Sequence, residues 1–265
     1  MTDDFTDSTL VLVAHGSTQN ADSAKPTRQH AAELRSRQLF AEVRDGFLKQ
    51  QPAVDGVLRS VTARHVFIVP LFISEGYFTE EVLPRELGFQ KSDDGSFGRG
   101  RQNAGQTLYY CGVVGTHASM TSALMSRARE IVEKHPFPLR PKPCDTTLFI
   151  AGHGTSKNEN SRKAIEQQVA LIRNKREYAD VRAVFLEEKP RVESCYELAA
   201  TRNIVIVPFF ISDGLHSSQD IPIKLGEPEK RVQQRLAKGQ PTWVNPTERQ
   251  GKRIWYSASI GTEPF

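Results

Sequence analysis

Two histidines and an acidic pair in the second half of the sequence are the residues best suited to chemistry. His153 directly follows one apolar run, Glu187 and Glu188 follow a second, and His216 lies shortly after a third. Ligands bind at the carboxyl ends of the strands in an open parallel sheet, so we expect these side chains to converge. Two imidazoles and a carboxylate form an N,N,O site suited to a divalent first-row metal.

The elements that must position these residues follow a regular alternation. Strands are predicted at Thr9–Ala14, Glu42–Leu48, Val66–Phe72, Thr147–Gly152, Asp180–Leu186 and Ile204–Phe210, with a further strand before Gly115 and before Gly261. Helices are predicted at Ser23–Arg37, Ala53–Thr62, Ser119–Lys134, Ser161–Lys175 and Arg191–Thr201, with a short one at Glu229–Lys238. Strands that alternate with helices predict an α/β fold with a parallel sheet covered on both faces.

The sequence is internally duplicated. The segment HGSTQNADS at His15 matches HGTSKNENS at His153, an offset of 138 residues (153 − 15). At the same offset, VFIVPLFISEGYF falls on IVIVPFFISDGLH. A conserved register over this length predicts two copies of one domain, at residues 1–140 and 141–265, joined through the proline-rich segment PFPLRPKP.

The first copy serves as an internal control for the candidate site. His15 is kept, but Lys49 replaces Glu187 and Phe78 replaces His216. These exchanges remove a cation site without disturbing the fold, so we expect only the second copy to bind metal.

The copies also differ outside the site. The predicted helix at Ser119–Lys134 has no counterpart after Gly261, so it either serves the interface or the second domain is capped differently. The connectors at residues 90–106 and 227–251 are polar and are expected to be mainly loops.

The ordered motifs HG, FLE, P-x-F and GLHSSQDIP resemble those of the class II tetrapyrrole chelatases, the CbiX-type sirohydrochlorin cobaltochelatases and their ferrochelatase relatives. The resemblance extends over about residues 10–130 and 148–261. It implies two tandem flavodoxin-like chelatase domains, each with a four-stranded parallel sheet flanked by helices. It also implies catalytic and metal-binding roles for His153, His216 and Glu187, with Glu188 as an alternative acid.

The implied function is insertion of Co²⁺ or Fe²⁺ into sirohydrochlorin, in cobalamin or sirohaem biosynthesis. The ion is then a substrate, and no tightly bound cofactor is expected. A neutral imidazole can ligate the ion and accept a pyrrole proton. Two alternatives remain open: a non-catalytic carrier of tetrapyrrole or metal, and a scaffold with a vestigial site.

Other polar residues near the predicted site have less certain roles. Basic groups that could pair with the carboxylates of a tetrapyrrole substrate are Lys157, Arg162, Arg191 and Lys224, although such groups are more often solvated surface charges. Asp220 is expected to cap the helix that follows it. His153 has a structural alternative, because its counterpart is kept in the degenerate copy.

Composition limits the remaining possibilities. The 35 basic and 31 acidic residues give a net charge of +4, and no basic run is interleaved with aromatics, so nucleic acid is not an expected partner. No apolar run approaches the roughly 20 residues of a membrane span. Three widely spaced cysteines predict free thiols. The polar start predicts a cytoplasmic protein, and the duplication favours a monomer that replaces an ancestral homodimer.

Overall fold

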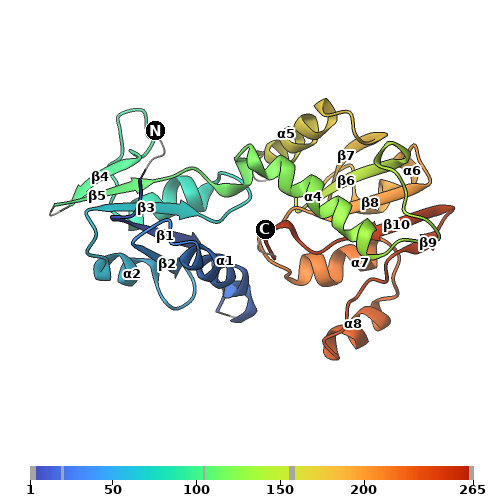
Figure 1. The fold of residues 1–265 in the computed structure, drawn as a ribbon, viewed down its shortest axis with the longest axis horizontal. Helices are drawn as coiled ribbons and strands as arrows, with labels where there is room; N and C mark the ends of the chain where they lie inside the picture. The colour runs from blue at the N-terminus through green and yellow to red at the C-terminus, as the bar shows by residue number, and fades with distance from the viewer. Residues whose placement is uncertain (1–3, 19–20, 104, 155–158, 263–265) are drawn as a thin grey trace. The chain divides into compact units, whose positions relative to one another are not determined.

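The computed structural model describes residues 4–18, 21–103, 105–154 and 159–262. The chain divides into two compact units, the first ending at His117 and the second extending from Ala118 to Thr262. Each unit contains one five-stranded sheet with helices on its faces (Figure 1). The predicted α/β fold with two tandem repeated domains is thereby confirmed.

The first unit is built on the sheet β2-β1-β3-β5-β4. Its strands are β1 (Ser8–Ala14), β2 (Glu42–Phe47), β3 (His65–Pro70), β4 (Gly100–Asn103) and β5 (Gln106–Tyr110). Its helices are η1 (Ala21–Ala24), α1 (Lys25–Ser36), α2 (Val54–Ser60), η2 (Phe78–Val82), α3 (Leu83–Glu86) and η3 (Val114–Thr116). All neighbouring strands are parallel except β4 and β5, which are antiparallel.

The second unit repeats this arrangement in the sheet β7-β6-β8-β10-β9. Its strands are β6 (Thr146–Gly152), β7 (Asp180–Phe185), β8 (Asn203–Pro208), β9 (Thr247–Arg249) and β10 (Lys252–Tyr256). Its helices are α4 (Ser119–Lys134), η4 (Pro143–Asp145), α5 (Asn160–Asn174), η5 (Val192–Ser194), α6 (Cys195–Leu198), η6 (His216–Asp220), α7 (Ile221–Lys224), α8 (Glu229–Ala237) and η7 (Ile260–Thr262). The expected division at residue 140 lies within this unit, after α4.

Each sheet has one more strand than the four expected. The added strands β4 and β9 lie in the connectors that were expected to be mainly loops, and each pairs antiparallel with the strand that follows it. In the second unit the hairpin turns at Gln250 and Gly251, with φ values of 51° and 72°. Two consecutive left-handed residues match the tight hairpin turn that Asn-Gly normally signals, and Gln-Gly is a weaker signal for the same turn.

The central strands form the core of each unit. Every residue of β6 is buried, as is every residue of β8 except Asn203. Strands covered on both faces need apolar side chains on both faces, which explains their continuous apolar sequences. Pro70 and Pro208 are the last residues of β3 and β8, where a missing amide hydrogen costs no ladder hydrogen bond.

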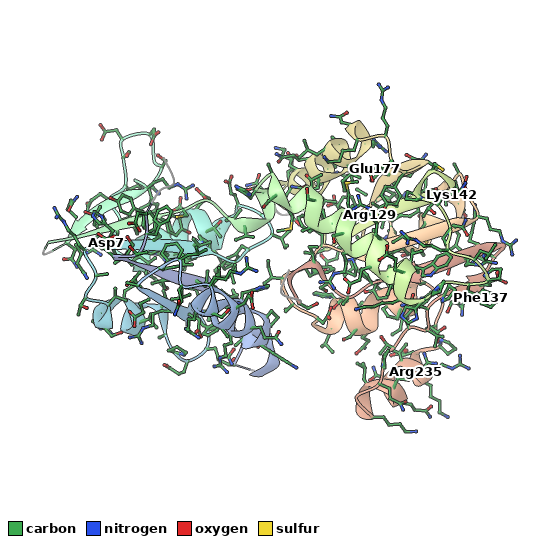
Figure 2. The ribbon with its side chains drawn as sticks, in the orientation of Figure 1. Asp7, Arg129, Phe137, Lys142, Glu177 and Arg235 are labelled. Atoms are coloured by element: carbon green, nitrogen blue, oxygen red, sulfur yellow. The ribbon has the colours of Figure 1, made fainter. Side chains whose placement is uncertain are left out.

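Helix α4 belongs to the second unit although it follows the last strand of the first repeat. It runs across the second sheet and contacts α5, β8 and β10 (Figure 1). The Thr121 hydroxyl donates to the Gln168 side chain at 2.7 Å, and the Trp255 indole donates to the His135 carbonyl at 2.8 Å. Arg129 forms an ion pair with Glu177 at 2.9 Å (Figure 2). The helix of the first repeat therefore covers the sheet of the second.

Two further predictions have different outcomes. The short helix expected at Glu229–Lys238 is present as α8, whereas the expected helix Arg191–Thr201 is only the short turns η5 and α6. Among the described residues, no helix has both the length and the apolar character to span a membrane.

Candidate metal centre

A glycine allows the two loops of the candidate site to meet. Gly154, directly after His153, has φ +66°, and an added Cβ there would lie 2.6 Å from the Glu188 side chain and 2.9 Å from that of Phe185. Any larger residue would push the loops apart. In this close approach the Glu187 amide donates to the His153 carbonyl at 3.0 Å. The backbone of the acidic loop is thus fixed beside the first histidine.

The second histidine lies in a π-helical turn. His216 begins the turn η6 and Asp220 ends it. Single π-helical turns are rare and concentrate at functional sites. Tyr256 of β10 holds the turn η6 in place, because its buried hydroxyl donates to the Ser217 carbonyl at 2.6 Å. Burial raises the pKa of Tyr256 well above its ordinary value, so the hydroxyl keeps the proton that it donates.

The two predicted imidazoles lie edge-to-face beside each other. The ring centroids of His153 and His216 are 4.6 Å apart, and the planes are nearly perpendicular at 81°. Imidazole nitrogens bind first-row metals at about 2.0–2.1 Å, so rings this close are near enough for both to contribute to one metal site. The sequence prediction that these two histidines converge is met by this geometry.

Hydrogen bonds determine which nitrogen of each ring is available. Nδ1 of His153 lies 2.6 Å from the Gly154 carbonyl, and Nδ1 of His216 lies 2.7 Å from Oδ2 of Asp220. Both partners are acceptors, so each Nδ1 carries the proton in the neutral ring. The Nε2 lone pair is then available on both rings, which is the tautomer in which Nε2 can bind a metal.

The two adjacent acids have different environments. Oε1 of Glu187 lies 3.7 Å from Nε2 of His153. The carboxylate of Glu188 instead pairs with Arg162 at 2.7 Å, and the Arg162 guanidinium also lies over the Phe185 ring. The geometry therefore favours Glu187 over Glu188 as the acid of the site.

The predicted triad is not a closed metal cage. In the part of the chain that the structure describes, no three histidine, cysteine or acidic side chains are arranged to hold one ion. Among the described residues Glu187 has a charge contact with His153 alone, and the side chains of His153, His216 and Glu187 are 36%, 49% and 59% exposed. An open site of two adjacent imidazoles and one nearby acid suits transient binding better than permanent retention.

The three predicted substrate-binding cations that the structure describes each contact a different part of the second unit. Arg162 is engaged with Glu166 and Glu188, and Lys224 pairs with Glu193 at 3.7 Å. The Arg191 guanidinium donates to the Leu186 carbonyl at 3.0 Å. Lys157 lies outside the described residues. Three of the four are therefore held by contacts within the second unit.

Asp220 has a role that the sequence prediction missed. Its side chain makes no helix-capping hydrogen bond and instead accepts from His216, so the expected cap was wrong. The spacing of four residues in GLHSSQDIP was the available signal, because a π-helical turn brings positions i and i+4 together. A carboxylate behind a metal-binding imidazole fixes its tautomer and orientation.

The first unit repeats the backbone of the site but keeps only the first of the two imidazoles. His15 and Phe78 lie with ring centroids 4.7 Å apart at 86°, nearly the arrangement of the two histidines. Nδ1 of His15 also lies 2.8 Å from the Gly16 carbonyl. At the position of Asp220 the first unit has Val82, the last residue of the π-helical turn η2. The second imidazole and its supporting carboxylate are therefore replaced together.

Comparisons with known proteins agree with this architecture. A protein from Halobacterium salinarum named a probable sirohydrochlorin cobaltochelatase is 39% identical over 97% of this chain and 87% of its own length. The sirohydrochlorin cobaltochelatase of Methanopyrus kandleri is 34% identical over 31% of this chain and 60% of its own.

Solved structures show the same fold. A multi-domain Deinococcus radiodurans protein described as similar to chelatases has a TM-score of 0.74 and 28% identity, covering 97% of this chain and 52% of its own. SirB from Bacillus subtilis, solved with Fe³⁺, has a TM-score of 0.66 and 16% identity, covering 97% of this chain and 90% of its own.

The CbiX family model matches residues 9–131 and 147–265. The family model matches both repeats, and the Halobacterium salinarum relative is 39% identical over 97% of this chain. The chain therefore belongs to the CbiX family.

Proposed function

We propose that this protein inserts Co²⁺ or Fe²⁺ into sirohydrochlorin, as a step of cobalamin or sirohaem biosynthesis. The observation that carries the proposal is the pair of adjacent imidazoles, His153 and His216, each with its Nε2 lone pair available. The names of two relatives suggest the substrate, since one is described as a probable sirohydrochlorin cobaltochelatase and the other as a sirohydrochlorin cobaltochelatase.

Metal insertion requires an ion that is held and then released. Two neutral imidazole nitrogens bind a first-row ion while leaving most of its coordination positions to water or to the incoming pyrrole nitrogens. The exposure of both rings leaves room for a macrocycle to approach the ion. Asp220 keeps His216 in the ligating tautomer and thereby acts as a positioning residue.

Insertion also releases two pyrrole protons. We assign their acceptance to Glu187, whose exposed carboxylate lies 3.7 Å from His153. A carboxylate beside the ion attracts the cation and can pass a proton to solvent. Glu188 is excluded from this role by its ion pair with Arg162, which neutralises its charge.

The other assignments follow from the same proposal. The ion is a substrate, so purified protein should not retain it through dialysis against a chelator. The tetrapyrrole is the small-molecule partner. We further propose that the protein is cytoplasmic. We also propose that it is a monomer, because two copies of the domain already occur in one chain. The mass in solution from light scattering tests the monomer.

A steady-state insertion assay tests the function directly. Purified protein is mixed with excess sirohydrochlorin and Co²⁺, Fe²⁺ or Ni²⁺, and product formation is followed by absorbance against a protein-free control. We expect many turnovers per chain with at least one of these ions. A single stoichiometric burst without turnover would contradict the enzyme and favour a tetrapyrrole or metal carrier.

A further inference from the structure

The first unit presents an exposed aromatic surface where the second presents imidazoles. Phe78 packs edge-to-face against His15, and Tyr77 packs on Phe78 with ring centroids 5.8 Å apart. Tyr77 is 62% and Phe78 37% exposed. Large aromatic side chains exposed together mark a binding surface more often than isolated ones do.

The backbone of a lysine is fixed beside His15, the residue on which Phe78 packs. The Lys49 amide donates to the His15 carbonyl at 2.8 Å, which is the counterpart of the bond between Glu187 and His153. The Lys49 side chain is exposed, and no carboxylate among the described residues forms an ion pair with it. Its ammonium group is therefore available to an anion from solution.

The charge around this loop is opposite in the two units. Lys49 occupies the position of Glu187, and Arg28 occupies that of Glu166 at the same offset of 138 residues (166 − 28). The Arg28 guanidinium donates to the Gln51 carbonyl, which holds its positive charge on the same loop. A positive loop repels a metal ion and attracts carboxylates.

The residues that replace the candidate metal site in the first unit share one chemical character. The ligand His216 is matched by an aromatic residue, the acid Glu187 by a lysine, and the neighbour Leu215 by Tyr77. Each exchange suits a flat conjugated ring bearing peripheral carboxylates. Aromatic side chains contact the faces of such a ring, and a lysine pairs with a carboxylate at its edge.

We propose that the aromatic-basic surface of the first unit, formed by Lys49, Tyr77 and Phe78, binds the tetrapyrrole macrocycle itself. Lys49 pairs with a peripheral carboxylate, and the two rings contact the macrocycle face. This inference rests on the proposed function, since it identifies the polycarboxylate tetrapyrrole as the ligand of a second site. In this proposal the first unit binds the tetrapyrrole and the second unit binds the metal ion.

Equilibrium binding without turnover tests the inference. Metal-free sirohydrochlorin is titrated into the full chain, and binding is followed by quenching of protein fluorescence; Co²⁺ is titrated separately by calorimetry. We expect Lys49→Glu and the double variant Tyr77→Ala/Phe78→Ala each to raise the Kd for the tetrapyrrole about tenfold or more. The Kd for Co²⁺ should stay within twofold of wild type. Lys49→Arg and Tyr77→Phe are the matched controls and should retain tetrapyrrole affinity.

The outcomes separate this inference from the proposed enzyme activity. His216→Ala should weaken Co²⁺ binding but leave the Kd for the metal-free tetrapyrrole within about threefold. A wild-type chain that binds the tetrapyrrole through Lys49 but never inserts metal would refute the chelatase activity and support this surface. Wild-type tetrapyrrole affinity in both Lys49→Glu and the double aromatic variant would overturn the inference. Circular dichroism melting confirms that the exposed substitutions leave the fold intact.

The salt dependence of the Kd for the tetrapyrrole is a second test of the pairing between Lys49 and a carboxylate. The difference in Kd between wild type and Lys49→Glu should shrink as ionic strength rises, because exposed charge pairs are screened. The effect of Tyr77→Ala/Phe78→Ala should persist at high salt, since contacts between rings do not depend on net charge. A Lys49 effect that is independent of salt would overturn the assigned pairing with a carboxylate.

Discussion

The two histidine loops of this protein share a backbone and differ in chemistry. In both units a histidine after the first strand packs edge-to-face against an aromatic ring of a π-helical turn, at 4.7 Å in the first and 4.6 Å in the second. In the second unit that ring is His216, supported by Asp220; in the first it is Phe78, followed by Val82. The comparison teaches that the fold fixes where the rings meet, and we expect the residues at these two positions of the turn, together with the acid at Glu187, to decide whether metal can bind.

Removing the second histidine should have the largest effect. His216→Ala leaves one imidazole at the site, so we expect the rate of metal insertion to fall at least a hundredfold. His15→Ala removes the matching histidine of the first unit and should reduce the rate only severalfold. Steady-state insertion assays on both variants make the measurement, and a larger loss in His15→Ala would show that the active lobe is assigned wrongly.

Helix α4 allows the stability of the two units to be compared, because it follows the first repeat in sequence but packs on the second unit. Leu124 is fully buried on this helix, so Leu124→Ala should destabilise the second unit by about 2–5 kcal/mol. Hydrogen exchange should show faster opening of β6 and β8 with little change in β1 and β3. Faster exchange in β1 and β3 instead would mean that α4 stabilises the repeat from which it comes in sequence.

The carboxylate behind His216 should have the next effect. Asp220→Ala removes the acceptor for Nδ1 and should weaken Co²⁺ binding about 10–100-fold. Asp220→Asn keeps an acceptor oxygen and should recover part of the affinity. Calorimetric titration measures both. If Asp220→Ala binds Co²⁺ as tightly as wild type, the carboxylate does not position the imidazole.

The adjacent acids should give opposite and smaller effects. Glu187→Gln should slow insertion severalfold at unchanged stability, because this exposed carboxylate approaches His153 and supports no other element. Glu188→Gln should keep the rate but lower the free energy of unfolding by about 1 kcal/mol, since it removes one of the two carboxylates that pair with Arg162. Insertion rates and urea unfolding of both variants test this assignment, and exchanged results would make Glu188 the acid of the site.

Much of the architecture could be predicted because the sequence repeats itself. Continuous apolar strands and the fixed offset between copies indicate two α/β units, and the strand ends bring His153 and His216 together. Hairpin strands such as β9 are short and polar, so their pairing with β10 leaves little trace in hydrophobic periodicity. The position of α4 depends on packing between segments that belong to different repeats, which an alignment of the two copies cannot reveal.

At the site, the sequence indicates which residues meet but not how they are oriented. The choice between Glu187 and Glu188 depends on the ion pair that Arg162 makes with only one of them. Asp220 looks like a helix cap by residue type, and only the π-helical turn shows that it faces His216 instead. Such roles follow from side-chain geometry rather than from the order of residues.

X-ray absorption at the cobalt edge tests the central claim most directly. Protein loaded with one equivalent of Co²⁺ should show scattering from two imidazole rings, unchanged in His15→Ala and reduced to one ring in His216→Ala. Two imidazole rings bound to Co²⁺ in His216→Ala, or one ring lost in His15→Ala, would contradict the claim that only the second unit binds the ion.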